Sequence, residues 1–268
     1  MQLFHIFITL FTLIVTIIPA GVARADFVTI RVPAYSDGTH SYFVDLLTTA
    51  LSKEGHLATI EQVSDIPHLR EWTMLEAGEL SVLWLSRTRQ RDKRYFPIPV
   101  NLTNGLVGKR ILLVPSDQRE AYKDVKTLRD FKGLGKTGGF GTQWFDVDIW
   151  KANDLPYLEV PQWRLLYNMV AEKSRGVDYF SRGLNEIADD TTLHSGLVIE
   201  PHIMLVYDRD YIFYVSPTRP KLAALLLTVL EKARDSGLMD QLIKKHWAKS
   251  LALLQPETRT VIPLHTPQ

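Results

Sequence analysis

The order of strand-like and helix-like segments is the feature that most constrains the fold of this chain. Residues 27–32 alternate between apolar and polar side chains, as a strand does, and residues 42–53 have the apolar spacing of a helix. A strand over 57–63, a helix over 69–77 and a nearly continuous apolar strand over 80–85 follow. A chain that begins β-α-β-α-β predicts an α/β fold, in which helices pack against a sheet.

The same alternation resumes further along the chain, so a second α/β unit is expected. A polar, basic stretch over 86–94 and the segment 97–99 predict a crossing between the two units. The second unit is predicted to contain a strand over 110–114, a helix over 125–131, a Gly-rich loop over 133–141, a helix over 142–153, a strand near 157, a helix over 163–173, a strand over 177–180 and a helical turn or two over 182–189. Strand material over 205–215 and closing helices over 220–247 complete the pattern.

The first 25 residues have the pattern of an export signal. An apolar run from Leu3 to Pro19 precedes Ala23-Arg24-Ala25, whose small residues suit signal peptidase. We therefore expect cleavage after Ala25 and a periplasmic protein. The run is also close to the ~20 residues of a membrane span, so an uncleaved anchor is the alternative. In either case the rest of the chain is expected outside the cytoplasm.

Charge and residue content argue against several classes of function. The full chain carries a formal net charge of +1, and removal of the signal takes Arg24 away, which leaves balanced charges and no sign of nucleic-acid binding. Cysteine is absent, so the chain has no disulfide, thiol nucleophile or lipid-anchor cysteine. The 8 histidines lack metal-ligand spacing, and no GxSxG motif occurs. We expect no metal, no cofactor and no catalytic nucleophile.

Several short segments resemble, in the same order, those of the bacterial extracellular solute-binding proteins of family 3, a group known for amino-acid uptake. These segments are residues 75–81, 88–91, 96–99, 125–131, 139–142, 175–178 and 237–247. Each match is short. Their common order from Phe27 to Trp247 carries the resemblance.

The resemblance implies an α/β fold of the periplasmic-binding-protein type 2, with two lobes, two crossover strands and a central cleft. We expect the signal at 1–25, the first lobe at 26–106, the second lobe at 107–208, and a return to the first lobe at 209–268, including a C-terminal tail. A small polar ligand would be buried between the lobes, which would close by a hinge motion.

Thr88 and Arg91 fall where the family holds a ligand carboxylate, so the resemblance implies that role for them. A guanidinium can hold a carboxylate through two parallel hydrogen bonds, and a hydroxyl adds a further donor. Arg87, Arg89 and other basic residues crowd the same stretch. A solvated basic loop is therefore the alternative interpretation.

Gly141 and Thr142 come directly before a predicted helix. The free amides at a helix start attract anions, and Thr142 could serve as the helix cap or as a direct donor. The resemblance implies a position at the cleft for both residues. An ordinary capped loop is the alternative.

Asp178 falls where family members hold the amino group of the ligand, which a carboxylate does by a charge-assisted hydrogen bond. Arg182 is a further candidate for ligand contact. Asp178, Arg182 and Glu186 are also spaced four residues apart. On a helix they could pair with one another instead, at about 0.2–0.5 kcal/mol per pair.

Three aromatic residues, Tyr35, Tyr42 and Trp144, flank the predicted cleft loops. Their rings could stack on a ligand, since aromatic side chains combine apolar area with a polar edge. Tyr35 is the preferred candidate. Tyr42 is expected to pack at the start of a helix instead.

The function that the sequence favours is that of a monomeric solute-binding protein, not an enzyme, which captures a carboxylate-bearing, amino-acid-like ligand for an ABC-type importer in the inner membrane. A sensory or accessory module of the same fold, acting with a membrane receptor, is the alternative. A dehydratase-like enzyme with Asp178 and Glu186 as its acids is a third possibility. Ser81 stands where the family usually has an acid, and residues 34–40 lack its usual Pro-Pro-Phe segment. The ligand class therefore stays open.

Overall fold

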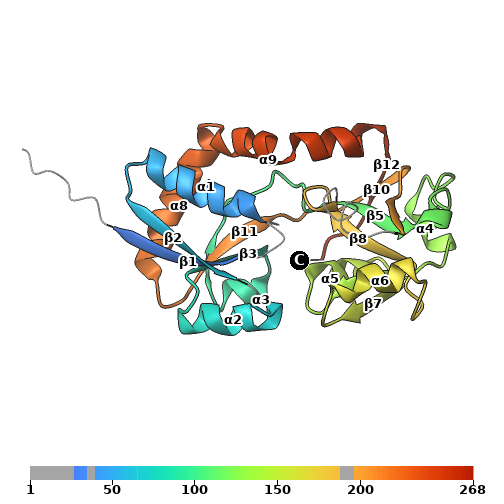
Figure 1. The fold of residues 1–268 in the computed structure, drawn as a ribbon, viewed down its shortest axis with the longest axis horizontal. Coiled ribbons are helices and arrows are strands. Elements are labelled where there is room, and N and C mark those ends of the chain that lie inside the picture. Colours follow the sequence, from blue (N-terminus) through green and yellow to red (C-terminus); the bar gives the residue numbers. More distant parts are fainter. Residues whose placement is uncertain (1–26, 35–39, 65, 188–195, 268) are drawn as a thin grey trace, which may run out of the picture.

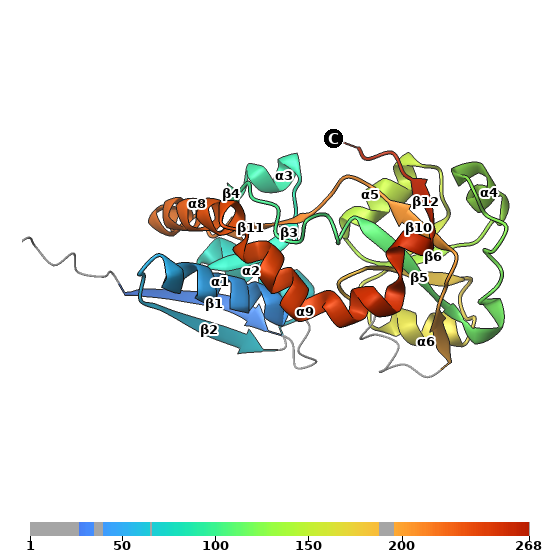
Figure 2. The same cartoon turned by 90° about the horizontal axis from the view of Figure 1, so that it is seen from above.

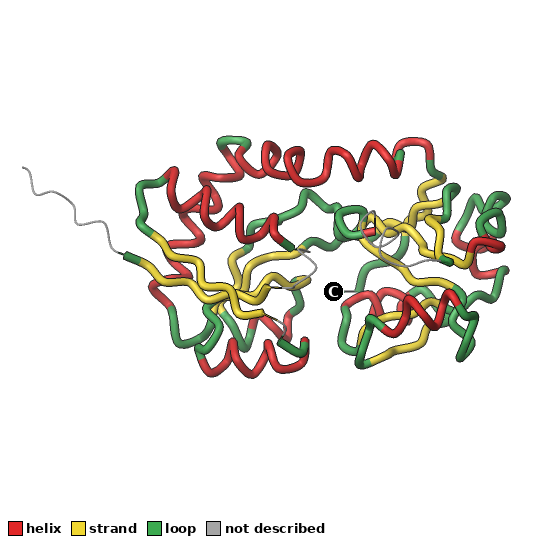
Figure 3. Tube along the Cα trace, in the orientation of Figure 1, coloured by secondary structure: helices red, strands yellow, loops and turns green. Residues whose placement is uncertain are grey.

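The computed structural model describes residues 27–34, 40–64, 66–187 and 196–267, which form two α/β lobes lying side by side (Figure 1). The predicted signal and the candidate Tyr35 lie outside these residues. Within the described residues no helix is long and apolar enough to cross a membrane. Strands lie inside each lobe, with helices around them (Figure 3). This architecture confirms the predicted fold class.

The first lobe combines the N-terminal segments with a segment that returns late in the chain. Its strands are β1 (Val28–Ala34), β2 (Ala58–Ser64), β3 (Val82–Ser86), β4 (Phe96–Ile98) and β11 (Tyr211–Val215). Its helices are α1 (Ser41–Lys53), α2 (His68–Ala77), α3 (Arg89–Asp92), α8 (Pro220–Asp235) and the first part of α9 (Leu238–Leu254). β1 pairs in parallel with β2, and β11 lies antiparallel between β3 and β4. The Ser81 amide donates to the Arg31 carbonyl at 2.7 Å, which joins these two groups of strands.

Helix α1 illustrates why the apolar spacing predicts its position correctly. Its buried side chains recur every three or four residues and form one face against the sheet: Tyr42, Phe43, Leu46, Leu47, Ala50 and Leu51. Helix α2 also ends as predicted, at Gly78, whose φ of 77° is left-handed and costs a glycine little.

The second lobe contains a mixed sheet with helices on its faces. Its strands are β5 (Lys109–Pro115), β6 (Gly138–Gly141), β7 (Tyr157–Val160), β8 (Tyr179–Gly183), β9 (Leu197–Ile199), β10 (Ile203–Val206) and β12 (Thr260–Pro263). Its helices are α4 (Leu128–Gly133), α5 (Phe145–Ala152) and α6 (Leu165–Ala171). The strand order is β12-β10-β5-β8-β6-β7, and β9 also pairs with β5. β6, β7 and β8 are parallel, so their carboxyl ends meet at one edge of the sheet.

The predicted Gly-rich loop is wrong in its second half, because residues 138–141 form the buried strand β6. Gly138 lies against the ring of Tyr179, where an added Cβ would come within 2.7 Å of ring carbon. Tyr179 is fully buried, and its hydroxyl accepts a hydrogen bond of 2.8 Å from the indole of Trp150. The glycine is needed here for close packing and not for a turn.

Gly138→Ala should lower the free energy of unfolding by about 1–3 kcal/mol, because the new methyl group overpacks a site that cannot expand. Gly133→Ala is the matched control. An added Cβ meets nothing within 4 Å at Gly133, the last residue of α4, so this variant should be neutral or slightly more stable. Urea denaturation of both variants measures the difference, and equal stabilities would contradict the packing argument.

Two extended segments cross between the lobes, one between β4 and β5 and one between β10 and β11. The Asp210 carboxylate joins them, since it accepts from the amides of Thr103 and Gly105 at 3.1 Å and 2.7 Å. The predicted strand material over 205–215 is therefore two strands in different lobes, with the crossing between them.

Helix α9 makes a third connection, running from the first lobe to the second (Figure 2). After it, β12 pairs in parallel with β10 of the second lobe. The buried guanidinium of Arg259 fixes this segment, since it donates to the Ile203 carbonyl at 3.1 Å and to the Leu254 carbonyl at 3.0 Å. The predicted assignment of 209–268 to the first lobe thus needs correction, because β12 completes the second sheet.

Candidate functional site

A cavity of about 420 Å³ lies between the two lobes. The first lobe contributes the side chain of His40, the ends of β1 and β3, the start of α2 and Arg91. The second lobe contributes residues 143–146 after β6, residues 161–164 after β7, and Arg182 and Glu186 at the end of β8. A concave site at the carboxyl ends of parallel strands is where α/β folds bind their ligands.

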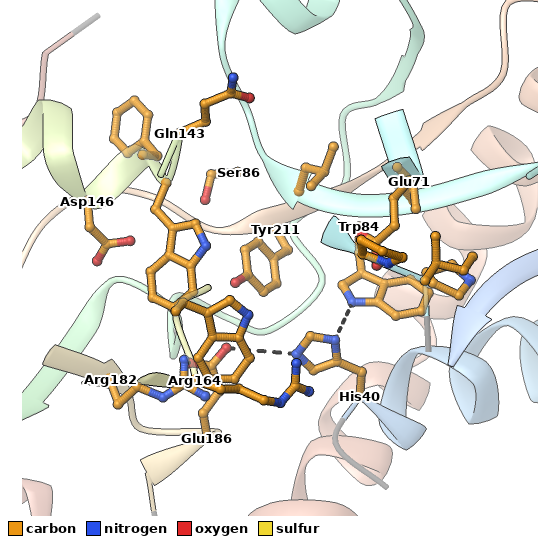
Figure 4. A pocket seen from close by; sticks show the side chains of 18 of the residues that line it. His40, Glu71, Trp84, Ser86, Gln143, Asp146, Arg164, Arg182, Glu186 and Tyr211 are labelled. Atoms are coloured by element: carbon orange, nitrogen blue, oxygen red, sulfur yellow. Dashed lines mark hydrogen bonds and ion pairs between the residues drawn. The ribbon is translucent and has the colours of Figure 1, made fainter. Parts of the chain in front are cut away.

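Aromatic rings from both lobes line this cavity. Trp84 and Tyr211 belong to the first lobe, and Trp84 stacks on Phe43 with ring centroids 4.8 Å apart and an angle of 14°. Trp144 and Trp163 belong to the second lobe, with ring centroids 5.6 Å apart. The rings give the cavity broad apolar walls, and its polar groups stand between them (Figure 4).

Gly141 and Thr142 do not line the cavity, although their neighbours do. An added Cβ at Gly141 would lie 2.5 Å from the Trp144 indole, so this glycine leaves room for that ring. The Thr142 amide donates to the Val160 carbonyl at 3.2 Å. Helix α5 is capped at Trp144 without a side-chain hydrogen bond, so the predicted capping role of Thr142 is wrong.

Arg91 lines the cavity, whereas Thr88, at the start of the same short helix, does not. The Thr88 hydroxyl caps this helix, α3, by accepting from the Arg91 amide at 3.2 Å. The Arg91 guanidinium lies 4.7 Å from the centre of the Trp72 ring and donates to the carbonyls of Ser86 and Gln143. Its bond to Gln143, 3.5 Å long, spans the two lobes. Burial lowers the pKa of Arg91 from its ordinary value.

Arg110 and Asp146, which both line the cavity, form a buried ion pair, with Arg110 Nη2 2.9 Å from Asp146 Oδ1. Arg110 also donates to the Ser181 carbonyl at 2.9 Å and to the Val107 carbonyl at 3.2 Å. Asp146 in turn accepts from the Tyr207 hydroxyl at 2.7 Å. Arg110 thus ties the first crossover to β8 and α5.

Arg182 and Glu186 form a second buried pair, with Arg182 Nη1 3.1 Å from Glu186 Oε2. The predicted helical turn over 182–189 is wrong at its start, since Arg182 and Gly183 belong to β8 and a turn brings Glu186 back. The Arg182 guanidinium also lies 5.1 Å from the centre of the Trp163 ring. Burial opposes ionisation of Glu186, but Arg182 and Arg110 outweigh it and lower the pKa of this carboxyl.

Glu186→Gln should lower the free energy of unfolding at neutral pH by roughly 1–3 kcal/mol, because buried charged donors lose their ionic partner. A lowered pKa in the folded state means that ionised Glu186 stabilises fully above its ordinary value of 4.5 and loses this effect as pH falls through the lower folded value. Urea denaturation across acidic pH should show the two proteins converging only in that lower range. A difference in the free energy of unfolding between the two proteins that stays constant down to the lowest pH would contradict a stabilising role of ionised Glu186.

His40 connects the first lobe to this pair. The Trp84 indole donates to His40 Nδ1 at 2.9 Å, so Nδ1 accepts and the proton of the neutral ring lies on Nε2. His40 Nε2 lies 4.0 Å from Glu186 Oε1 across the cavity (Figure 4). This contact and the hydrogen bond from Arg91 to Gln143 each join a described residue of the first lobe to one of the second lobe across the cavity.

Asp178 lies away from the cavity, which corrects its predicted position. It precedes the first residue of β8, at the opposite edge of the sheet from Arg182. Its carboxylate accepts from the Thr137 amide at 2.8 Å and lies 3.8 Å from the Lys136 ammonium. Asp178 therefore fixes a loop and is not paired with Arg182 or Glu186.

Tyr42 packs in the core as predicted, with its hydroxyl donating to the Leu102 carbonyl at 2.5 Å. The sequence interpretation missed other cavity residues, including His40, Glu71, Asp146, Trp163 and Arg164. Trp163 and Arg164 follow the predicted strand near residue 157, so the rule of carboxyl ends could have found them. Within the described residues no cluster of three or more His, Asp or Glu side chains could hold a metal ion.

The fold is that of amino-acid ABC transporter substrate-binding proteins. A similar solved structure is such a protein from Streptococcus pneumoniae, bound to L-arginine, at 14% identity and a TM-score of 0.59, covering 84% of this chain and 94% of that one. Another is a histidine kinase sensor domain with similarity to periplasmic binding proteins, at 14% identity and a TM-score of 0.59, covering 81% and 95%.

A third similar structure is the second substrate-binding domain of Lactococcus lactis GlnP in an open conformation. It is 15% identical, with a TM-score of 0.54, and the match covers 84% of this chain and 97% of that one. No protein-family model and no curated protein sequence matches this chain. At these identities the comparison establishes the fold and not the ligand.

Proposed function

We propose that this protein is a periplasmic solute-binding protein that captures a small carboxylate-bearing ligand between its lobes. The observation that carries the proposal is the position of Arg91, a guanidinium in the cavity that donates to carbonyl oxygens and forms no ion pair among the described residues. A carboxylate is the group that such a fork of donors binds best.

The contacts across the cavity support capture by closure of the lobes. Arg91 and His40 of the first lobe reach Gln143 and Glu186 of the second, so a ligand between them would complete contacts from both sides. The volume of the cavity, about 420 Å³, suits a molecule of amino-acid size. The Streptococcus pneumoniae protein of the same fold is an amino-acid ABC transporter substrate-binding protein, which supports delivery of the ligand to an ABC-type importer.

A thermal-shift screen of the purified protein tests this proposal. The panel contains amino acids, aliphatic and aromatic carboxylates, polyamines and sugars, each at millimolar concentration. A ligand that binds only the native state raises the melting temperature. We expect stabilisation by at least one carboxylate and none by sugars or polyamines. Stabilisation by polyamines alone, or by no member of the panel, would contradict the proposal.

A sensory role is the second candidate, because the chain shares its fold equally well with a histidine kinase sensor domain. The same cavity would then report its occupancy to a membrane receptor. Affinity purification from membranes separates the two roles, since recovery of a permease favours uptake and recovery of a kinase favours sensing.

A further inference from the structure

The carboxylates in the described wall of the cavity are already engaged. Asp146 pairs with Arg110 and accepts from Tyr207, and Glu186 pairs with Arg182. Glu71, the remaining acid, is 2% exposed and has an interaction of its own. A ligand ammonium group at Asp146 or Glu186 would share a carboxylate whose charge a buried guanidinium already balances, and this would leave excess positive charge in a buried site, which is unfavourable.

Asp178, the residue predicted to hold an amino group, does not reach the cavity. Its carboxylate serves the Thr137 amide at the far edge of the sheet. The described wall thus lacks an available carboxylate at the place where the sequence predicts one. An ammonium group bound against this part of the cavity would lose its water without gaining a charged partner among the described residues.

Arg91, unlike the carboxylates of the cavity wall, has hydrogen-bonding capacity to spare. A guanidinium carries five N–H donors, and the acceptors of Arg91 are two carbonyl oxygens, those of Ser86 and Gln143. Donors are left over, and the guanidinium forms no ion pair with an acid among the described residues. One ligand carboxylate would satisfy both.

The remaining surface of the cavity is aromatic. Trp84 and Tyr211 stand on one side, and Trp144 and Trp163 on the other. The Arg182 guanidinium lies 5.1 Å from the Trp163 ring centre and 5.8 Å from that of Trp144, which holds these indoles in place. Walls of this kind favour a flat ring, which can stack on or pack edge-to-face against them.

We infer that the ligand is an aromatic monocarboxylate without an α-ammonium group, held by Arg91 through its carboxylate and by the four aromatic side chains through its ring. This inference rests on the proposed function and narrows its ligand class. Such a ligand differs from the L-arginine bound to the Streptococcus pneumoniae protein of the same fold.

Isothermal titration calorimetry with matched pairs of compounds tests the inference. The pairs are 3-phenylpropanoate with L-phenylalanine and indole-3-propanoate with L-tryptophan, which differ only in the α-ammonium group. We expect the member without the ammonium group to bind at least about tenfold more tightly in one pair or both. Trp163→Leu should weaken that binding, whereas Tyr157→Leu, an exposed aromatic in β7 outside the cavity, should not.

The outcomes separate failure of this inference from failure of the proposed function. Tighter binding of the amino acid than of its partner in every pair that binds, or Arg91-dependent binding of a non-aromatic amino acid alone, would overturn the inference and leave carboxylate capture intact. Absence of binding by these four compounds and by every other carboxylate of the screen would overturn both.

Discussion

Arg110→Met should lower the free energy of unfolding by about 3–5 kcal/mol, because it leaves Asp146 charged and buried without its partner. Arg110 is 2% exposed, and its guanidinium also serves the carbonyls of Val107 and Ser181. Loss of one side chain therefore disturbs the first crossover, β8 and α5 together. Urea denaturation of the purified variant, with the slope compared to the parent protein, measures the change.

Two companion variants make this prediction specific. Lys132→Met breaks an exposed pair with Asp154 and should cost no more than about 1 kcal/mol. Arg110→Met combined with Asp146→Asn should recover part of the loss, since the amide can still accept from Tyr207 and carries no charge. A single variant as stable as the parent, or a double variant with fully additive losses, would show that the ion pair is not the cause.

Arg91→Ala should weaken binding of the tightest carboxylate in the panel by about 2 kcal/mol, roughly 30-fold in Kd, because charge-assisted hydrogen bonds to the ligand are lost. The fold should tolerate this change, since Arg91 lies at the cavity surface on the short helix α3. Isothermal titration calorimetry gives the affinity, and the melting temperature without ligand reports on the fold.

Lys93→Ala is the matched control, because Lys93 follows α3 directly, is exposed and carries the same charge. If the basic stretch attracted anions only by its overall charge, both variants would weaken binding equally. We expect binding by the Lys93 variant to stay within about twofold of the parent, since distant exposed charges are screened by salt. Equal losses in the two variants would remove Arg91 from the site.

The fold could be predicted in most of its elements because periodicity is a local property. A few neighbouring residues determine the apolar face of α1 and the end of α2 at Gly78. β6 was not predicted because its glycines resemble a loop, and two of them pack against side chains far along the chain, Gly138 against Tyr179 and Gly139 against Leu166. β12 was missed because its partner β10 lies far from it in sequence.

The site could be predicted in part, and the failures have a geometric cause. Arg91 and Arg182 reach the cavity, whereas Thr88, Gly141 and Thr142 lie directly behind residues that line it. Neighbouring residues in sequence point in different directions, and a motif does not say which of them faces a ligand. Trp163 follows a predicted strand, but that it faces Arg182 depends on the parallel order of β7, β6 and β8, which no single segment contains.

Helix α9 changes the mechanics of any motion between the lobes. Two extended crossovers alone would permit rotation with little elastic resistance, since each is a single strand of chain. α9 is a stiff rod beside them, packed on α1 and α8 at one end and continued into β12 at the other. Helices curve gently, with radii of ~60–100 Å, and resist sharper bending. A rotation of one lobe against the other would therefore have to bend this rod, shift β12 along β10 or change the turn at 255–259 that joins them, and each of these opposes the rotation.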